Sequence, residues 1–87
     1  MNPEVIQRVR SYIEDNFLYM RPDAVLNDDD SLLGTGIIDS MGVMELIVFV
    51  ESEFGVSVAD AEVTKDNFDS VATIAAFVES KAASAAA

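Results

Sequence analysis

Apolar residues recur at spacings of three and four in three parts of the chain, and this period is typical of amphipathic α-helices. The first part predicts a helix over residues 3–17, with its apolar stripe at Ile6, Val9, Ile13 and Phe17. The last part predicts a helix over residues 71–81, with its stripe at Val71, Ile74, Phe77 and Val78. We expect the first helix to serve as scaffold, because its polar face carries only solvated side chains.

The middle part begins at Ser40, runs for about fifteen residues and carries more apolar residues than one buried helix face can use. At about 100° per residue, one stripe collects the core candidates Val43, Leu46, Ile47, Val50 and Phe54. Met41 and Val48 fall on the far side. Glu45 and Glu51 flank this pair, and Ser40 lies at the end of the same outward face. An apolar pair framed by carboxylates favours a docking surface, although single exposed apolar residues are also common.

A long connection over residues 18–38 separates the first two helices. We expect it to be held by its own apolar side chains, namely Val25, Leu26, Leu32, Leu33, Ile37 and Ile38. A short third helix is predicted from Asp60 to about Lys65. The pattern therefore predicts an all-α bundle of four helices, three longer and one short, with a long first loop. Residues 1–81 are expected to form a single domain, and the Ala/Ser tail 82–87 to fray.

The net charge of −11 is concentrated in the middle of the chain. Between Pro22 and Thr64 there are ten acidic residues and no lysine or arginine. Such a surface repels the phosphates of nucleic acids and attracts basic proteins. We therefore expect basic protein partners and no nucleic acid, with a merely solubilising acidic surface as the alternative.

The absence of cysteine and histidine further limits the catalytic and metal sites that the chain could form. Without them the chain has no evident nucleophile–base pair and lacks the usual transition-metal ligands. The aspartate run 28–30 fails as a calcium loop, because Leu33 stands where the loop requires glycine. We therefore expect neither an enzyme nor a metal site. The N-terminus has no apolar signal region and the apolar run 46–50 is too short to span a membrane, so we expect a cytoplasmic protein. We also expect a monomer.

Ser40 is the residue that these patterns single out for chemistry. Asp39 is a plausible N-cap of the middle helix, which leaves Ser40 on the first turn with its hydroxyl pointing outward. A phosphate attached there would meet the N–H groups at the helix start, where the macrodipole favours negative charge. A serine or aspartate at this place is usually only a cap. Ser40 has no partner base, so it suits a group attached by another enzyme better than catalysis.

The run Gly36-Ile37-Ile38-Asp39-Ser40-Met41, followed by Glu45-Leu46, resembles the attachment signature of acyl carrier and peptidyl carrier proteins. The resemblance covers essentially the whole chain, through Glu53-Phe54 to the entry of the last helix at residues 67–71. It implies a non-enzymatic carrier whose Ser40 receives 4′-phosphopantetheine from coenzyme A through a phosphopantetheinyl transferase. The terminal thiol of this arm would hold acyl groups as thioesters.

The resemblance also implies a docking face for basic partner enzymes of fatty-acid, polyketide or related biosynthesis, formed by Asp39, Met41, Glu45, Val48 and Glu51. Met41 replaces a commoner leucine, and Gly42 costs a helix about 1 kcal/mol. The run Asp39-Ser40-Met41-Gly42 is also similar to D-alanyl and other aminoacyl carrier proteins, so the cargo stays open between acyl chain, polyketide unit and amino acid. An acidic helical adaptor that is never modified is the alternative from a different class.

Overall fold

The computed structural model describes residues 2–19, 21 and 23–86, and these residues form helices, turns and loops without a strand. The elements, in chain order, are α1 (Pro3–Phe17), α2 (Ser40–Phe54), a 3₁₀ turn (Asp60–Glu62), α3 (Lys65–Phe68) and α4 (Val71–Ala86). Three longer helices and one short helix confirm the predicted all-α bundle with its long first loop.

Capping residues satisfy free backbone groups at the start of α1 and at the end of α2. Asn2 caps α1, because its Oδ1 accepts a hydrogen bond from the Glu4 N–H at 2.9 Å. Helix α2 ends at Phe54, and its C-cap Gly55 adopts the left-handed conformation (φ 66°) that a non-glycine residue would reach only with strain.

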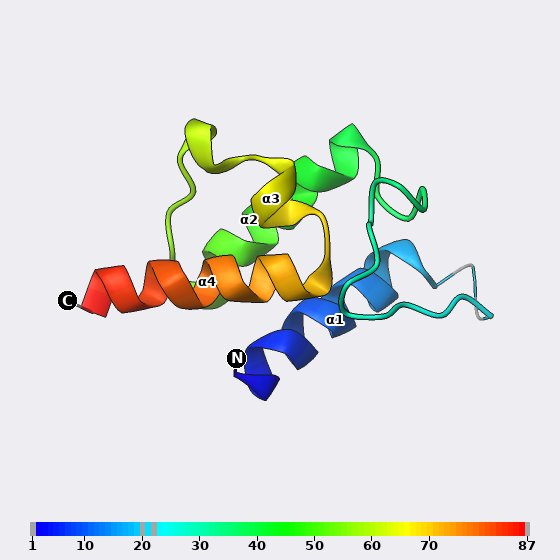
Figure 1. The fold of residues 1–87 in the computed structure, drawn as a ribbon, viewed down its shortest axis with the longest axis horizontal. Helices are drawn as coiled ribbons and strands as arrows, with labels where there is room; N and C mark the ends of the chain where they lie inside the picture. The colour runs from blue at the N-terminus through cyan, green and yellow to red at the C-terminus, as the bar shows by residue number, and fades with distance from the viewer. Residues whose placement is uncertain (1, 20, 22, 87) are drawn as a thin grey trace.

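The core lies where α4 packs against α1, α2 and α3 (Figure 1). Val9 and Ile13 from α1, Leu46 and Val50 from α2 and Ile74 from α4 are fully or almost fully buried. The predicted stripes of α1, α2 and α4 thus supply the core. Four of their members are half-buried and pack against it, namely Ile6, Phe17, Val43 and Phe54.

The predicted position of the short third helix is wrong. Asp60–Glu62 forms only a 3₁₀ turn, and the α-helical turn comes later, at Lys65–Phe68. Its anchor is Phe68, which is buried and lies 5.1 Å from Phe77 of α4 between ring centroids. One buried aromatic residue creates no repeating pattern, so periodicity could not locate this helix.

Helix α4 is longer than expected, since it continues to Ala86 instead of ending near Lys81. Alanine has the highest helix propensity of any residue, which explains the extension through the Ala/Ser segment. The division into a domain of residues 1–81 and a fraying tail remains a prediction.

The long first loop is fixed to the bundle by buried side chains and by hydrogen bonds to the start of α4. Leu26, Leu32 and Ile38 are buried, and Ile37 is half-buried, as expected, whereas Val25 and Leu33 are exposed, contrary to the prediction. Leu33 lies in a turn, and Val25 lies in an irregular stretch of the loop.

Backbone contacts complete this attachment. The Leu32 N–H donates to the Asp69 carbonyl at 2.6 Å, and the Ser31 hydroxyl donates to Asp69 Oδ1 at 2.8 Å. The Ala72 N–H donates to the Asp28 carbonyl at 2.9 Å. The loop that leads to Ser40 is therefore held by the entrance of α4.

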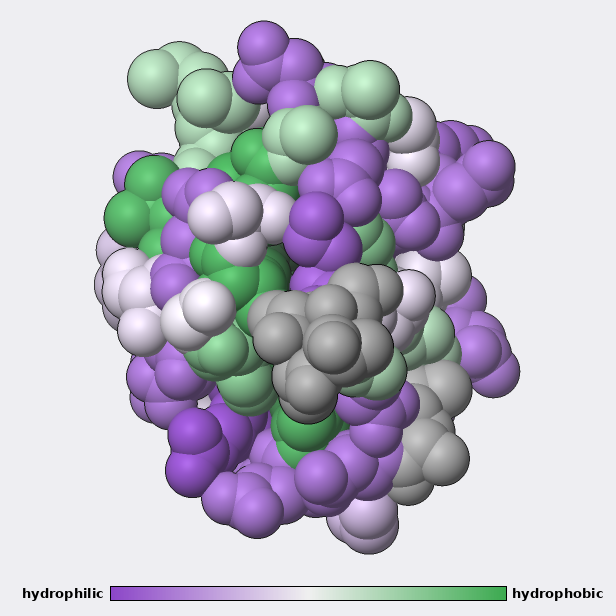
Figure 2. Space-filling view, turned by 90° about the vertical axis from the view of Figure 1, so that its left-hand side faces the viewer, coloured by the Kyte–Doolittle hydropathy of each residue, from purple (hydrophilic) through white to green (hydrophobic). Residues whose placement is uncertain are grey.

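Hydrophilic residues cover much of the surface seen from the left-hand side of Figure 1, with smaller hydrophobic areas between them (Figure 2). In the part of the chain that the structure describes, none of the helices has the length and apolar character needed to cross a membrane.

Candidate attachment site and docking surface

Ser40 is exposed and is the first residue of α2, where the sequence predicted it. Asp39 acts as the cap, because its Oδ1 accepts a hydrogen bond from the Gly42 N–H at 2.8 Å. The cap therefore does not require the Ser40 hydroxyl, which makes no hydrogen bond with any residue that the structure describes. A serine in this position is open to modification by an enzyme that approaches from solvent.

The helix start also fits a phosphate ester on Ser40. The Val43 N–H donates to the Asp39 carbonyl and the Gly42 N–H to the Asp39 side chain, so the cap takes up two of the first-turn donors. The N–H groups of Ser40 and Met41 precede the first helical hydrogen bond and find no acceptor among the described residues. They and the helix dipole would favour an attached phosphate.

Close packing explains why glycine occupies position 42, and the sequence did not reveal this. It is buried, and a Cβ on it would lie 2.9 Å from Ile38 Cγ2 and 3.0 Å from Phe17 Cε1. Ile38 belongs to the segment that leads to the site and Phe17 to the end of α1. The missing side chain thus lets both elements approach the first turn of α2, which offsets the helix propensity lost at glycine.

The outward face of α2 carries a stripe of exposed apolar residues formed by Met41, Met44 and Val48, which we call the apolar stripe. Their exposed fractions are 79%, 63% and 63%. Met41 and Val48 were predicted to face outward, whereas Met44 was not singled out from the sequence. Three exposed apolar side chains at positions i, i+3 and i+7 of one helix form a continuous strip suited to a protein partner.

The two glutamates predicted to flank this stripe differ in their surroundings. Glu45 is exposed, and its carboxylate forms no ion pair with the described part of the chain. Glu51 is half-buried, and its Oε2 accepts a hydrogen bond from the Val58 N–H at 3.0 Å. The carboxylate of Glu51 thus fixes the loop that follows α2, and a role of this residue in partner binding remains a prediction.

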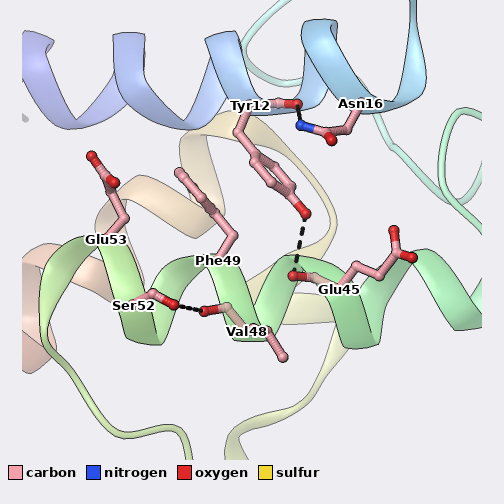
Figure 3. A pocket seen from close by; sticks show the side chains of 7 residues that line it. All are labelled: Tyr12, Asn16, Glu45, Val48, Phe49, Ser52 and Glu53. Carbon is pink, nitrogen blue, oxygen red and sulfur yellow. Dashed lines mark hydrogen bonds between the residues drawn. The ribbon is translucent and has the colours of Figure 1, made fainter.

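A groove of about 470 Å³ lies between α1 and α2, beside the apolar stripe (Figure 3). Its floor is formed by Tyr12 and Phe49, whose rings stack with centroids 4.0 Å apart. The Tyr12 hydroxyl donates to the Glu45 carbonyl at 3.3 Å. The pKa of Tyr12 is raised above its ordinary value of 10.0, mainly by burial and to a smaller extent by the nearby Glu45 carboxylate.

The complete lining of the groove is Tyr12 and Asn16 from α1 with Glu45, Val48, Phe49, Ser52 and Glu53 from α2. Only Glu45 and Val48 had been singled out from the sequence. The others come together through the packing of two helices that are distant in the chain, and no local motif marks them.

Comparison with known proteins identifies the family of this chain. The family model described as "Phosphopantetheine attachment site" matches residues 7–78. The chain belongs to the phosphopantetheine-attachment family. It is a carrier domain, and its cofactor is a covalently attached 4′-phosphopantetheine arm.

Two relatives of this carrier are the D-alanyl carrier proteins of Streptococcus pyogenes serotype M1 and of serotype M5 (strain Manfredo). Each is 37% identical over 62 residues, which is 71% of this chain and 77% of the relative. A similar solved chain comes from a structure described as "Crystal structure of FAD-dependent dehydrogenase". The two chains are 28% identical with a TM-score of 0.70, over 80% of this chain and 97% of that chain.

The cofactor of this family brings a reactive group to the carrier. A phosphopantetheine arm supplies a thiol, the group that a chain without cysteine lacks. The protein then contributes an attachment point, a rigid helix start and a surface that partner enzymes can bind.

Proposed function

We propose that Ser40 is the attachment residue and that the carrier holds an amino acid as a thioester, in the manner of a D-alanyl carrier protein. The observation that carries the proposal is the exposed Ser40 hydroxyl at a helix start capped by its neighbour Asp39. The curated relatives, named D-alanyl carrier proteins, favour an amino acid over the fatty acyl or polyketide unit that the sequence left open.

We propose further that partner enzymes dock on the apolar stripe and are oriented by Glu45. The stripe offers apolar area, and the exposed carboxylate attracts a basic partner. The partners are a phosphopantetheinyl transferase and an enzyme that activates an amino acid and loads it on the thiol. Glu51 contributes negative charge to this face, although its carboxylate is already engaged.

The attachment is tested by intact mass. The protein is incubated with coenzyme A and a broad-specificity phosphopantetheinyl transferase, and we expect a gain of about 340 Da, the carrier portion of coenzyme A. Ser40→Ala should abolish the gain, whereas Ser80→Ala, at an exposed serine of α4, should leave it unchanged. A gain that persists in Ser40→Ala would place the arm elsewhere.

The cargo is tested on protein purified from its native cell under conditions that preserve thioesters. An alanyl group on the arm is the expected result, and a long acyl chain would refute the aminoacyl assignment. The similar solved chain comes from a structure described as an FAD-dependent dehydrogenase, which suggests flavin dehydrogenases as a further partner class. With such a partner the carried group would be found two hydrogens lighter, because the flavin accepts them.

The docking surface is tested by reversing one charge. Glu45→Lys should slow modification by the transferase several-fold at low salt, with a smaller difference at high salt because screening weakens the attraction. Glu14→Lys makes the same change on an exposed residue of α1 and should have little effect. Equal effects of the two variants would indicate that only the net charge matters. An unmodified adaptor instead predicts that partner binding in the cell survives in Ser40→Ala.

A further inference from the structure

The groove between α1 and α2 combines an aromatic floor with an acidic rim. Figure 3 shows Tyr12 directed from α1 towards α2 and Phe49 directed from α2 towards α1, with Glu45 and Glu53 at the two ends. A second hollow of about 330 Å³ continues the groove along α1 and adds Asp15 to its lining. Three carboxylates thus surround a half-buried pair of stacked rings.

The charges of this rim do not cancel within the described part of the protein. Among the described residues that line the groove and the second hollow, Arg8 in the second hollow is the one basic residue, and it forms ion pairs with Glu53 at 3.2 Å and with Glu4 at 2.9 Å. Glu45 and Asp15 form no ion pair with the described residues. The groove is therefore complementary to a small cation, whose charge would meet a carboxylate and an aromatic face together.

Size and position make the carrier's own cargo a suitable occupant. From Ser40 to Val48 the helix rises about 12 Å. The phosphopantetheine arm has about as many chain atoms as five extended residues, which span about 17 Å. The apolar stripe lies on the outward face between Ser40 and the groove, so the methyl and methylene groups of the arm have apolar surface along their course.

We propose that this groove receives the α-ammonium group of an aminoacyl thioester carried on the protein's own arm. Glu45 pairs with the ammonium group, and the Tyr12–Phe49 pair forms the floor beneath it. This inference rests on the proposed function and adds a site that distinguishes aminoacyl from simple acyl cargo. Glu45 and Val48 belong both to the groove and to the proposed docking surface, so a docked partner displaces the cargo and presents it for reaction.

The experiment compares two cargoes that differ only in the ammonium group. The transferase installs arms from coenzyme A analogues in which a stable amide replaces the thioester and which end in a D-alanyl or a propionyl group. Intact mass establishes that each arm is attached, which separates a failure of this inference from a failure of the attachment proposal. Amide ¹⁵N–¹H spectra are then recorded at low salt against the protein with an unloaded arm.

We expect the alanyl form to shift the signals of Tyr12, Asn16 and Phe49 several-fold more than the propionyl form does. The tethered group has an effective concentration of about millimolar, so partial occupancy is sufficient for this difference. Glu45→Gln should remove most of the difference, whereas Glu14→Gln, a matched change on an exposed residue outside the groove, should preserve it.

A second readout follows the ammonium group itself. A nearby carboxylate favours the charged form, so the pKa of a ¹⁵N-labelled alanyl group should be higher in the wild type than in Glu45→Gln. The expected change is about two- to fivefold in the acid dissociation constant, typical of an exposed ion pair, and it should shrink at high salt. Equal shifts from both cargoes, or groove shifts that appear only when a partner protein is added, would overturn the proposal.

Discussion

Replacing Gly42 by alanine tests whether the first turn of α2 is packed as the structure shows. On an exposed helix surface this change stabilises a protein by about 1 kcal/mol, because alanine is the better helix former. Here the new methyl group would lie 2.9 Å from Ile38 Cγ2 and 3.0 Å from Phe17 Cε1, closer than ordinary van der Waals contact. The sign of the effect therefore depends on how far these two side chains can move.

The expected balance is unfavourable. Forcing one methyl group into a packed site costs about 1–3 kcal/mol, and the middle of this range exceeds the gain of about 1 kcal/mol in helix propensity. We expect a net loss of about 1 kcal/mol in the free energy of unfolding. In a domain of this size such a loss lowers the melting temperature by about 4–8 °C.

Urea unfolding of the wild type, Gly42→Ala, Phe17→Leu and the double variant measures this balance. Leucine at position 17 removes the Cε1 atom that approaches the glycine, so the double variant should be more stable than the sum of the single changes predicts, by at least about 0.5 kcal/mol. If Gly42→Ala raises the stability by about 1 kcal/mol, the close approach at this turn does not exist and the reasoning fails.

Two further predictions concern titrating groups. The pKa of Glu62 is lowered below its ordinary value of 4.5, mainly because its carboxylate accepts a hydrogen bond from the Ala59 N–H. A hydrogen bond from Lys81 is the second cause. The Glu62 carboxylate therefore stabilises the fold above pH 4.5, and this contribution is lost as the pH falls through the lowered pKa. In urea unfolding, the free energies of unfolding of wild type and Glu62→Gln should differ at about pH 7 and become equal in acid. The phenol of Tyr12 should remain neutral to a higher pH than an ordinary tyrosine, and Glu45→Gln should lower its pKa in an ultraviolet titration. An unchanged Tyr12 titration in that variant would contradict the placement of the two groups.

Most of the fold could be predicted because three helices carry their apolar residues at helical spacing. Ile13, Leu46 and Ile74 lie in such repeats, and all three are fully buried. Ser40 could be singled out for a related reason, since an Asp-Ser pair at the start of a strongly patterned helix fixes which residue caps and which faces solvent.

The features that escaped prediction depend on contacts between distant segments. Met44 lies near the edge of the helical stripe, and only the absence of a neighbour over it makes it exposed. Glu51 reaches a backbone N–H of the following loop, a contact that no periodicity encodes. From the sequence alone, Gly42 lowers the helix propensity of this segment. Its packing role becomes visible only when Phe17 and Ile38 are seen to lie against it.

The bonds from Ser31 and Leu32 to Asp69 have a practical consequence for engineering this domain. A chimera that exchanges only the segment around Ser40 would lose the Ser31 hydroxyl as the donor to Asp69 Oδ1 unless the new segment supplies one, although nearly forty positions lie between the two residues in the chain. Segments 28–40 and 69–72 should therefore be transplanted together as one cassette, because the geometry that partner enzymes encounter is set at both.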